Sequence, residues 1–399
     1  MRLSHLLILP AAVGMLIVAI LFLLLSGLLL IECLAALARR SPQPMVDTSV
    51  RAAVLIPAHN EAICIHKTLE CLVSQVSELQ DILVVADNCT DDTAEIARSF
   101  GVSVVERSNP SQRGKGYALD YGLKALAELP PDVVVIVDAD CLVQPGAVGR
   151  LVCEAIATQR PVQATYLMEK PAQPSLKDAV SAFAFKVKNL VRLKGLRQLG
   201  LPCSLTGTGM AFPWQALQTV DLASSHIVED MKLGLDLAIA GYPPTFCPEA
   251  QVLGQLPQEE AAAKGQRTRW EHGHLQMIKA YGLPTLATAI RRWRFDLLVM
   301  GLDLCIPPLS LLVVLWAFCL ITAAIVGILT SFWWPLALLA VSGSFIGIAI
   351  LSAWLKFGRS ELSFQQLISI PLYIAAKVPL YLSALRKPQA EWVKTKRDA

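Results

Sequence analysis

Two aspartates separated by one residue, Asp138 and Asp140, directly follow the apolar run at residues 133–137. Acids at such a position often cap the next helix, but capping does not require two acids around an alanine. Paired carboxylates can instead bind a hard divalent cation, and Mg²⁺ prefers one or two carboxylates together with water and substrate phosphate oxygens. The pair therefore indicates a site for a metal ion and a phosphate group, although D-x-D also occurs by chance in turns.

Two further apolar runs end in polar residues. The run AVLI leads into PAHNE, which contains Pro57, Asn60 and Glu61, and the run ILVVA leads into DNCTDD, which begins at Asp87. Helix capping is one explanation for these amides and acids. Ligands of open parallel sheets, however, bind at the carboxyl ends of the strands. We therefore expect the three polar strand ends to converge on one crevice.

A basic, glycine-containing loop follows. The sequence SQRGKGYAL places Arg113 and Lys115 among glycines. Such a loop can bind phosphate groups through its cations and backbone amides, although it lacks the GxxxxGK[ST] spacing of a P-loop. A solvated basic loop before a helix explains the same residues equally well.

Three segments in the second half of the chain carry further candidate residues. They are the small-residue loop SLTGTGMAF, the helix start VEDMKLGLDL and the sequence QRTRWEHG. The candidates are Gly207, Thr208 and Gly209 in the first segment, Glu229 and Asp230 in the second, and Gln266, Arg269 and Trp270 in the third. Each segment also has a purely structural explanation: a turn, an acidic helix cap and an interfacial basic helix.

The candidate residues in the first half of the soluble segment lie in a region of alternating strand and helix patterns. The runs AAVLIP, DILVVAD, VSVVE and DVVVIVD predict buried strands, and helical patterns lie between them at 61–75, 91–100 and 116–129. Buried strands separated by helices indicate parallel βαβ units. The predicted fold class is therefore α/β.

The composition indicates a membrane protein with a soluble part. Of the 399 residues, 54% are hydrophobic and 17% are charged, which is too apolar for an ordinary soluble enzyme. Residues 6–31 are uncharged and long enough for one span, and residues 304–355 are long enough for two. A cleaved signal peptide is the alternative for the first run, but its apolar core usually has only about 7–15 residues. The net charge of +3 gives no indication of a nucleic-acid partner.

Basic residues next to the apolar runs predict the orientation. They are Arg39 and Arg40 after the first run, Arg291, Arg292 and Arg294 before the second, and Lys356 and Arg359 after the third. The positive-inside rule then places the N-terminus outside the cell's inner membrane and the middle of the chain in the cytoplasm. The predicted organisation is an anchor at 1–40, a cytoplasmic domain at 50–275, interfacial helices at 276–303, two transmembrane helices at 304–356, and an interfacial or re-entrant segment with a basic tail at 362–399.

In this order, PAHNE, DNCTDDT, DAD, VED and QRTRW resemble the motifs of family-2 glycosyltransferases with a GT-A fold. The closer resemblance is to the membrane branch that includes cellulose, chitin and hyaluronan synthases, and it covers residues 52–270 and the flanking spans. Each motif alone is weak, but five in the right order are specific. The resemblance implies a Rossmann-like, mostly parallel sheet with flanking helices, a nucleotide-sugar donor, usually UDP-linked, and inversion at the anomeric carbon.

The resemblance also implies roles for the candidate residues. Asp138 and Asp140 would hold Mg²⁺ or Mn²⁺ at the diphosphate, and Asp230, beside Glu229, would be the catalytic base. The nucleotide-sugar would bind to Pro57, Asn60, Glu61, Asp87, Lys115 and Asp138. The acceptor and diphosphate side would consist of Gly207, Thr208, Gly209, Gln266, Arg269 and Trp270. His59 departs from the tyrosine or small residue of many relatives, and the span count is lower than in the large synthases.

Several interpretations of the function stay open. One is a single transfer to a lipid or other membrane-embedded acceptor, and another is processive polysaccharide synthesis, which QRTRW favours. Three or four spans are too few for a polymer channel unless the chain oligomerises or has a partner subunit. A catalytically silent adaptor is less favoured because the acids and QRTRW are intact. A transporter is disfavoured because, apart from Asp303 and Lys377, the spans lack the buried charges of an ion path.

Overall fold

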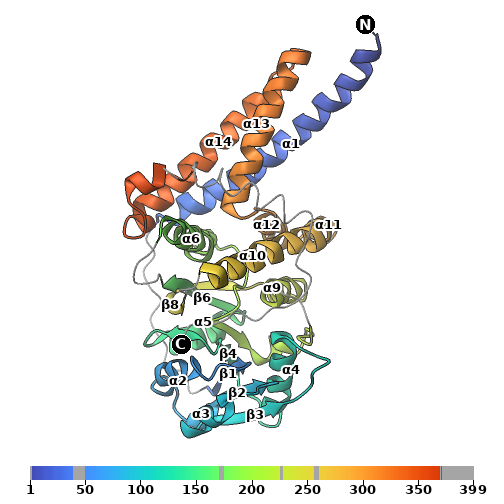
Figure 1. Cartoon of the computed structure of the whole chain (residues 1–399). Helices are drawn as coiled ribbons and strands as arrows, with labels where there is room; N and C mark the ends of the chain where they lie inside the picture. Colours follow the sequence, from blue (N-terminus) through green and yellow to red (C-terminus); the bar gives the residue numbers. More distant parts are fainter. Residues whose placement is uncertain are drawn as a thin grey trace.

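The structure is a computed structural model that describes residues 2–38, 50–169, 175–224, 228–255, 260–368 and 370. A sheet flanked by helices occupies one end of the molecule, and three long helices project from the other end (Figure 1). The predicted interfacial segment and basic tail lie outside the described residues from residue 371 onward, and so does Lys377.

Eight strands form one mixed sheet in the order β3-β2-β1-β4-β7-β6-β8-β5. The strands are β1 (Ala52–Ala58), β2 (Ile82–Asp87), β3 (Ser103–Arg107), β4 (Val133–Ile136), β5 (Cys141–Val143), β6 (Val162–Glu169), β7 (Met210–Pro213) and β8 (Thr245–Gln255). The four strands predicted from the sequence pair in parallel. β7 pairs antiparallel with β4 and β6, and β5 pairs antiparallel with β8, so the less regular half of the sequence supplies the antiparallel part.

Helices cover both faces of this sheet. The helices of the soluble part are α2 (Ile65–Val73), α3 (Thr93–Ser99), α4 (Lys115–Leu126), α5 (Ala147–Thr158), α8 (Trp214–Leu217) and α9 (Glu229–Ile239). In β1, Val54 belongs to the same core cluster as Leu69 of α2, whereas Leu55 belongs to the cluster of Leu123 in α4. Successive strand residues point to opposite faces, so a strand covered on both sides must be apolar throughout.

The projecting helices are α1 (Arg2–Ala35), α13 (Leu309–Thr330) and α14 (Trp334–Ala353). Within the described residues, three segments are long and apolar enough to cross a membrane: Pro10–Ala35, Leu309–Thr330 and Trp334–Gly358. This confirms the three predicted apolar spans by length and composition. Ser331 adopts a left-handed backbone with φ 59° and ends α13, so the chain turns toward α14 within the sequence TSFWWP at residues 330–335.

A layer of shorter helices joins the sheet to the long helices (Figure 1). These are α6 (Leu176–Lys186), the π-helical turns Val187–Arg192, α7 (Leu193–Gln198), α10 (Glu260–Met277), the π-helical turns Ile278–Gly282, α11 (Leu283–Arg291) and α12 (Phe295–Leu304), while the π-helical turns Trp354–Gly358 extend α14. Phe183 and Val187 pack in one cluster with Leu29 of α1 and Ile346 of α14. The candidate membrane helices therefore share a core with the soluble part.

A buried ion network crosses this junction. The guanidinium of Arg192 donates to Glu32 Oε2 at 2.7 Å and to Asp303 Oδ1 at 2.5 Å, and the Ser204 hydroxyl donates to Asp303 Oδ2 at 3.0 Å. Glu32 is fully buried near the end of α1. The expectation of no buried charge in the spans apart from Asp303 and Lys377 was therefore wrong. The Glu32 carboxylate pairs with Arg192 of the soluble part, so Glu32 belongs to the junction between the long helices and the soluble part.

Candidate active site

A cavity of ≈ 730 Å³ lies between the carboxyl ends of the parallel strands and the junction helices. The end of β1 contributes Pro57 and Glu61, the end of β2 contributes Asp87, and the end of β4 contributes Asp138 and Asp140. The predicted convergence of the three polar strand ends is confirmed. Parallel strands bring their carboxyl ends to one edge of the sheet, so residues distant in sequence face one crevice.

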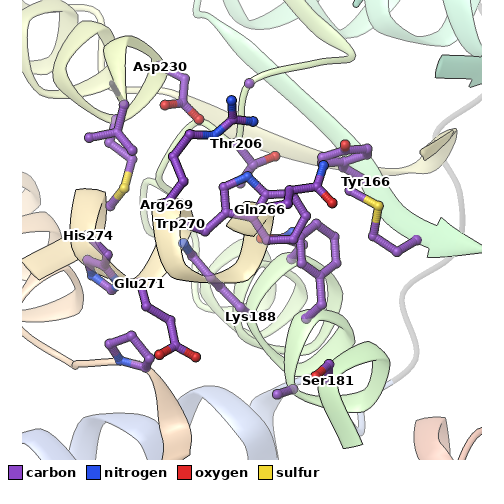
Figure 2. A pocket seen from close by; sticks show the side chains of 18 of the residues that line it. Tyr166, Ser181, Lys188, Thr206, Asp230, Gln266, Arg269, Trp270, Glu271 and His274 are labelled. Carbon is purple, nitrogen blue, oxygen red and sulfur yellow. The ribbon is translucent and has the colours of Figure 1, made fainter. Parts of the chain in front are cut away.

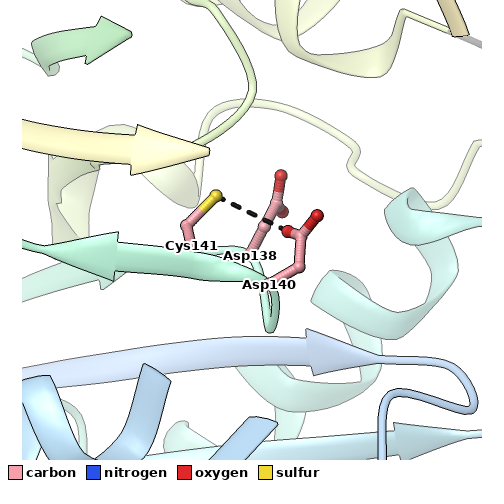
Figure 3. A group of neighbouring side chains, drawn as sticks. All are labelled: Asp138, Asp140 and Cys141. Carbon is pink, nitrogen blue, oxygen red and sulfur yellow. Dashed lines mark hydrogen bonds between the residues drawn. The ribbon is translucent and has the colours of Figure 1, made fainter. Parts of the chain in front are cut away.

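Asp138 and Asp140 lie next to each other beside Cys141 (Figure 3), and one ligand atom from each of the three residues lies within 4.8 Å of the others. The Cys141 thiol is buried and donates to Asp140 Oδ1 at 3.5 Å. Burial, together with the charges of both aspartates, raises the pKa of Cys141 well above its ordinary value. A protonated thiol is a poor ligand for Mg²⁺ or Mn²⁺, whereas the two carboxylates supply the oxygen donors that such ions require. The residues therefore fit a hard divalent cation held by Asp138 and Asp140.

Lys115, the first residue of α4, connects three of the predicted motifs. Its ammonium forms an ion pair with Asp138, lies 3.9 Å from Glu229 Oε1, and donates to the Gly207 carbonyl at 2.5 Å. Burial lowers the pKa of Lys115, but the carboxylates of Asp138 and Glu229 outweigh it and raise the pKa above its ordinary value. Lys115 is therefore a permanent cation between Asp138 of the predicted metal site and Glu229, the neighbour of the predicted base.

Glu229 and Asp230 begin α9 and both line the cavity. Burial raises the pKa of Glu229 to about 7, although the Lys115 ammonium opposes this rise. Burial also raises the pKa of Asp230, again against Lys115. Asp230 faces the small-residue loop, since a Cβ atom added to Gly207 would lie 3.4 Å from Asp230 Oδ2. A carboxylate with a raised pKa at the wall of a cavity is suited to accept a proton near neutral pH.

The small-residue loop supports the site more than it lines it. Gly207 has a φ of +98° and lines the cavity, whereas Thr208 is buried and its Oγ1 accepts a hydrogen bond from the Asp138 amide at 3.0 Å. Gly209 has a φ of +63°, and a Cβ atom there would lie 2.7 Å from Val252. Thr208 and Gly209 therefore do not line the cavity. They support its wall instead, because Thr208 holds the Asp138 backbone and both residues position the neighbouring Gly207.

Gln163 of β6 holds the same loop and was missed in the sequence. This fully buried residue accepts from the Thr206 amide at 2.8 Å and donates to the Thr208 carbonyl at 2.9 Å. A lone amide side chain in the apolar strand VQATY was the available signal, because a buried polar group requires a partner.

At the nucleotide end, Asp87 is only 5% exposed and pairs with Arg107 at 2.6 Å. Arg107, the last residue of β3, was not among the candidate residues, although it directly follows the predicted strand VSVVE. Asn60 has a left-handed backbone with φ 54°, and its Oδ1 accepts from the Thr90 amide at 2.6 Å. Among the predicted nucleotide-binding residues, Asn60 is the one that does not line the cavity.

His59 Nδ1 donates to the Asp87 carbonyl at 2.7 Å. His59, which departs from the family pattern, therefore links the end of β1 to the end of β2.

The QRTRW segment belongs to α10, where Gln266, Arg269 and Trp270 share a face at i, i+3 and i+4 and line the cavity. Figure 2 shows the Arg269 guanidinium directed toward Asp230. The Trp270 ring lies 5.3 Å from the ring of Phe185, which in turn packs edge-on against Tyr166 at 5.3 Å. α10 therefore brings a cation toward Asp230 and completes an aromatic wall.

Beyond these residues the cavity continues between the long helices. This far part is lined by Pro307, Pro308, Leu309, Ser310, Val313 and Trp316 before and in α13, by Gly343, Ile346, Gly347, Ile350 and Leu351 of α14, and by Leu367 and Ile370. Nearly all of these side chains are apolar. The candidate membrane helices complete the same cavity as the acids, which no local sequence pattern indicates.

Residues 50–273 match the family model described as "Glycosyltransferase like family 2". The probable glycosyltransferase YdaM of Bacillus subtilis is 26% identical over 261 residues, which cover 62% of this chain and 60% of YdaM. The 4,4'-diaponeurosporenoate glycosyltransferase of Staphylococcus haemolyticus is 27% identical over 206 residues, which cover 47% of this chain and 52% of that protein. The chain thus spans less than two thirds of the length of either relative.

Among solved structures, the mannosyltransferase PcManGT from Pyrobaculum calidifontis, in complex with GDP-Man and Mn²⁺, superposes with a TM-score of 0.53. The superposition covers 86% of this chain and 98% of PcManGT at 19% sequence identity, which shows a common fold. The family model covers more than half of the chain, and its bounds enclose the five predicted motifs. The prediction from those motifs is confirmed: the chain belongs to glycosyltransferase-like family 2.

Proposed function

We propose that this protein is a membrane-bound inverting glycosyltransferase that moves a sugar from a nucleotide-sugar to a hydroxyl group of a membrane lipid. The observation that carries the proposal is the single cavity, which joins the acidic strand ends to an apolar crevice between α13 and α14. A polar donor at the acidic strand ends and an apolar acceptor in the crevice can therefore meet at Asp230.

The donor side of the proposal rests on the charges around Asp138 and Asp140. These carboxylates would hold Mg²⁺ or Mn²⁺, which when bound would neutralise charge on the departing diphosphate. Lys115 and Arg269 are two of the protein's own cations that line the cavity, and Arg113 of the basic loop also lines it. Their fixed positions would stabilise the leaving group without reorganisation during the reaction. Asp87, oriented by Arg107, would contact the base of the nucleotide.

The acceptor side of the proposal rests on Asp230. The attacking hydroxyl must lose its proton as its oxygen bonds to the anomeric carbon and the bond from that carbon to the diphosphate breaks. Asp230 would accept the proton, and a positioned base of this kind typically contributes about 10²–10⁴-fold to the rate. Glu229 stays paired with the Lys115 ammonium, and this pair would fix the charges around Asp230.

The apolar crevice supports a lipid acceptor over a polysaccharide. Burying sugar hydroxyls against Ile346, Ile350 and Leu351 would leave them without hydrogen-bond partners, which costs free energy for each group. An alkyl or isoprenoid chain in the same crevice would instead be stabilised by about 25 cal/mol per Å² of apolar surface removed from water.

A polysaccharide synthase that exports its product through an oligomer or a partner subunit is the second candidate. It is favoured by the aromatic wall of Tyr166, Phe185 and Trp270, because aromatic faces also pack against sugar rings. The two candidates differ in their product, which decides between them.

The test uses the purified full-length protein in lipid nanodiscs, with a membrane lipid extract, Mn²⁺ and radiolabelled UDP- and GDP-sugars. GDP-sugars are included because PcManGT was crystallised with GDP-Man. We expect the label in the organic phase as a lipid carrying one sugar. A ladder of water-soluble products on a gel would favour the polysaccharide synthase instead, and no nucleotide release from any donor would refute both.

Asp230→Asn should reduce transfer at least about 100-fold while nucleotide affinity changes little, because the amide keeps the shape but cannot accept the proton. Asp236→Asn is the matched control, since Asp236 lies on the same helix and pairs with Lys232 at 2.5 Å, away from the cavity wall. Wild-type transfer by Asp230→Asn, or loss of nucleotide affinity with retained turnover, would remove Asp230 from the role of base.

A further inference from the structure

Lys188 stands between the two halves of the cavity. It belongs to the π-helical turns that follow α6, and its side chain extends into the cavity on the side of α10 (Figure 2). π-helical turns within α-helices often occur at functional sites, because the extra residue redirects a side chain. Neither the resemblance nor the proposed transfer step assigns a role to Lys188.

Within the described part of the chain, no hydrogen bond or ion pair joins the Lys188 ammonium to another residue, although the charges of Asp230 and Asp303 act on it. The neighbouring Asp303 uses one carboxylate oxygen for Arg192 and the other for Ser204, so it is already engaged. Burial lowers the pKa of Lys188, and Asp230 only partly opposes this effect. A cation in this position requires an anion, because an uncompensated buried charge is costly.

Three other polar groups that line the cavity also lack hydrogen-bond partners among the described residues. They are the buried atoms Asn189 Oδ1, Thr206 Oγ1 and Gln266 Oε1. Gln266 is only 7% exposed. Buried polar groups are nearly always satisfied in a functional complex. The Thr206 hydroxyl can donate to an anion, and Gln266 Oε1 can accept from a hydroxyl group of the same bound molecule.

The apolar crevice belongs to the same cavity as these groups, and Val187, the residue before Lys188, packs in one cluster with Trp316 and Ile346. Trp316 and Ile346 form its walls, and a Cβ atom added to Gly347 would meet no atom within 4 Å. The wall at Gly347 is therefore open space that a ligand can occupy. A molecule that satisfies the polar groups and also fills this crevice must have a charged head and an apolar tail.

We propose that the lipid acceptor is an anionic amphiphile whose phosphate or carboxylate group binds Lys188 and the Thr206 hydroxyl while its apolar tail lies against Gly347 between α13 and α14. This inference rests on the proposed function and names the acceptor class for that site. The anionic group anchors the acceptor, and the tail direction sets how far the head reaches toward Asp230.

Binding of model head groups tests the anchor. The protein in phosphatidylcholine nanodiscs is titrated calorimetrically with dodecyl phosphate, dodecanoate, dodecanol and inorganic phosphate, with empty nanodiscs as the blank. We expect dodecyl phosphate and dodecanoate to bind at least tenfold more tightly than dodecanol, because a charge-assisted hydrogen bond is lost with the neutral head. Inorganic phosphate should bind weakly, since it lacks the tail. Equal affinity for dodecanol would overturn the proposal, and equal affinity for inorganic phosphate would show an anion site without a lipid tail.

Lys188→Met should reduce dodecyl phosphate affinity at least tenfold, and Lys188→Arg should restore most of it. Lys194→Met is the matched control, because Lys194 lies on α7 with its ammonium 5.4 Å from the Phe357 ring and does not line the cavity. The affinity for UDP and GDP with Mn²⁺ is measured for each variant. If Lys188→Met weakens nucleotide binding by the same factor, Lys188 binds the donor diphosphate and the proposal is wrong.

Filling the crevice tests the tail. Gly347→Phe should weaken dodecyl phosphate binding at least fivefold but leave binding of butyl phosphate unchanged, because only the long chain reaches the crevice. Gly14→Phe is the matched control, since Gly14 lies on the apolar helix α1, away from the cavity, and also has no atom within 4 Å of an added Cβ. Equal loss for both chain lengths, or no loss, would contradict the tail placement.

The two proposals fail in different ways. Nucleotide binding and sugar transfer to an uncharged lipid would leave the proposed function intact and refute only the anionic acceptor. Absence of nucleotide binding in the wild-type protein would refute the proposed function, whatever amphiphile binds to the crevice.

Discussion

At the scale of single residues, the site is organised around charges that neutralise one another. Lys115 contacts Asp138, Glu229 and the Gly207 carbonyl, so one ammonium orders groups from three motifs. The Cys141 thiol, which burial keeps protonated, donates to Asp140 Oδ1 at 3.5 Å.

Removal of the metal should abolish transfer. We expect excess EDTA to reduce product formation below detection and Mn²⁺ or Mg²⁺ to restore it, because Asp138 and Asp140 supply oxygen ligands that suit these ions. Asp140→Asn should lose at least about 100-fold in activity at saturating donor and resist rescue. Asp120→Asn provides the control, since Asp120 pairs with Lys124 on the surface of α4. Full activity in EDTA would exclude a required metal.

The pH profile should report the buried acids. Burial raises the pKa of Glu229 to about 7 and raises that of Asp230, and a base must be unprotonated to accept a proton. Asp230 should therefore become protonated, and activity should fall, at a higher pH than for an ordinary carboxylate, which titrates near 4, by up to about tenfold per pH unit. The measurement is kcat/KM for the donor between pH 5 and 9. A profile that stays flat down to pH 5 would contradict the raised pKa values.

At the scale of elements, the junction between α1 and the soluble part depends on a close backbone approach. α7 crosses α1 at Gly195, where an added Cβ atom would lie 1.9 Å from the Glu32 carbonyl oxygen. The same crossing brings Arg192 to the Glu32 carboxylate. A residue with a side chain at position 195 would force both helices apart and stretch this ion pair.

Gly195→Ala should destabilise the protein, because overpacking against rigid backbone typically costs about 1–3 kcal/mol. Gly265→Ala is the control, since Gly265 lies in α10 and has no atom within 4 Å of an added Cβ. That control should be neutral or stabilised by up to about 1 kcal/mol through helix propensity. Thermal unfolding in detergent compares the two. Equal melting temperatures for both variants would show that α1 and α7 do not pack as closely as described.

At the scale of the whole molecule, apolar surface gathers at the end that carries the long helices. Leu283, Ile290 and Trp293 of α11 and the residues that follow it are 79%, 68% and 95% exposed. α11 and α12 lie beside the bases of the long helices (Figure 1). We propose that these residues rest in the membrane interface, which tryptophan favours, and that the sheet faces the cytoplasm.

This orientation predicts the result of a protease experiment. Trypsin should cut the soluble part in inverted inner-membrane vesicles but not in intact spheroplasts, because the basic residues beside the spans hold the domain inside. A tag at the N-terminus should show the opposite accessibility. A cytoplasmic control protein establishes that the spheroplasts are sealed. Cleavage in sealed spheroplasts would reverse the predicted topology.

The sequence alone predicted much of this molecule. Apolar runs predicted the parallel strands and the three candidate spans, since a segment buried on all sides must be apolar wherever it lies. The motif order predicted the family, and the polar strand ends predicted the crevice, because the geometry of a parallel sheet brings those ends together. These features depend on local composition or on a general rule of topology.

Only the tertiary structure decided how the two halves of the cavity meet. Lys188 lies in a basic helical segment that the sequence could equally assign to a solvated surface, and Arg192 reaches a glutamate 160 residues away. Asn60 looked like a ligand-binding residue but holds the Thr90 loop, while Gln163 looked like an ordinary strand residue but holds the small-residue loop at Thr206 and Thr208. Contacts of this kind depend on packing between distant segments, and no local pattern encodes which side chain finds a partner and which is left for a ligand.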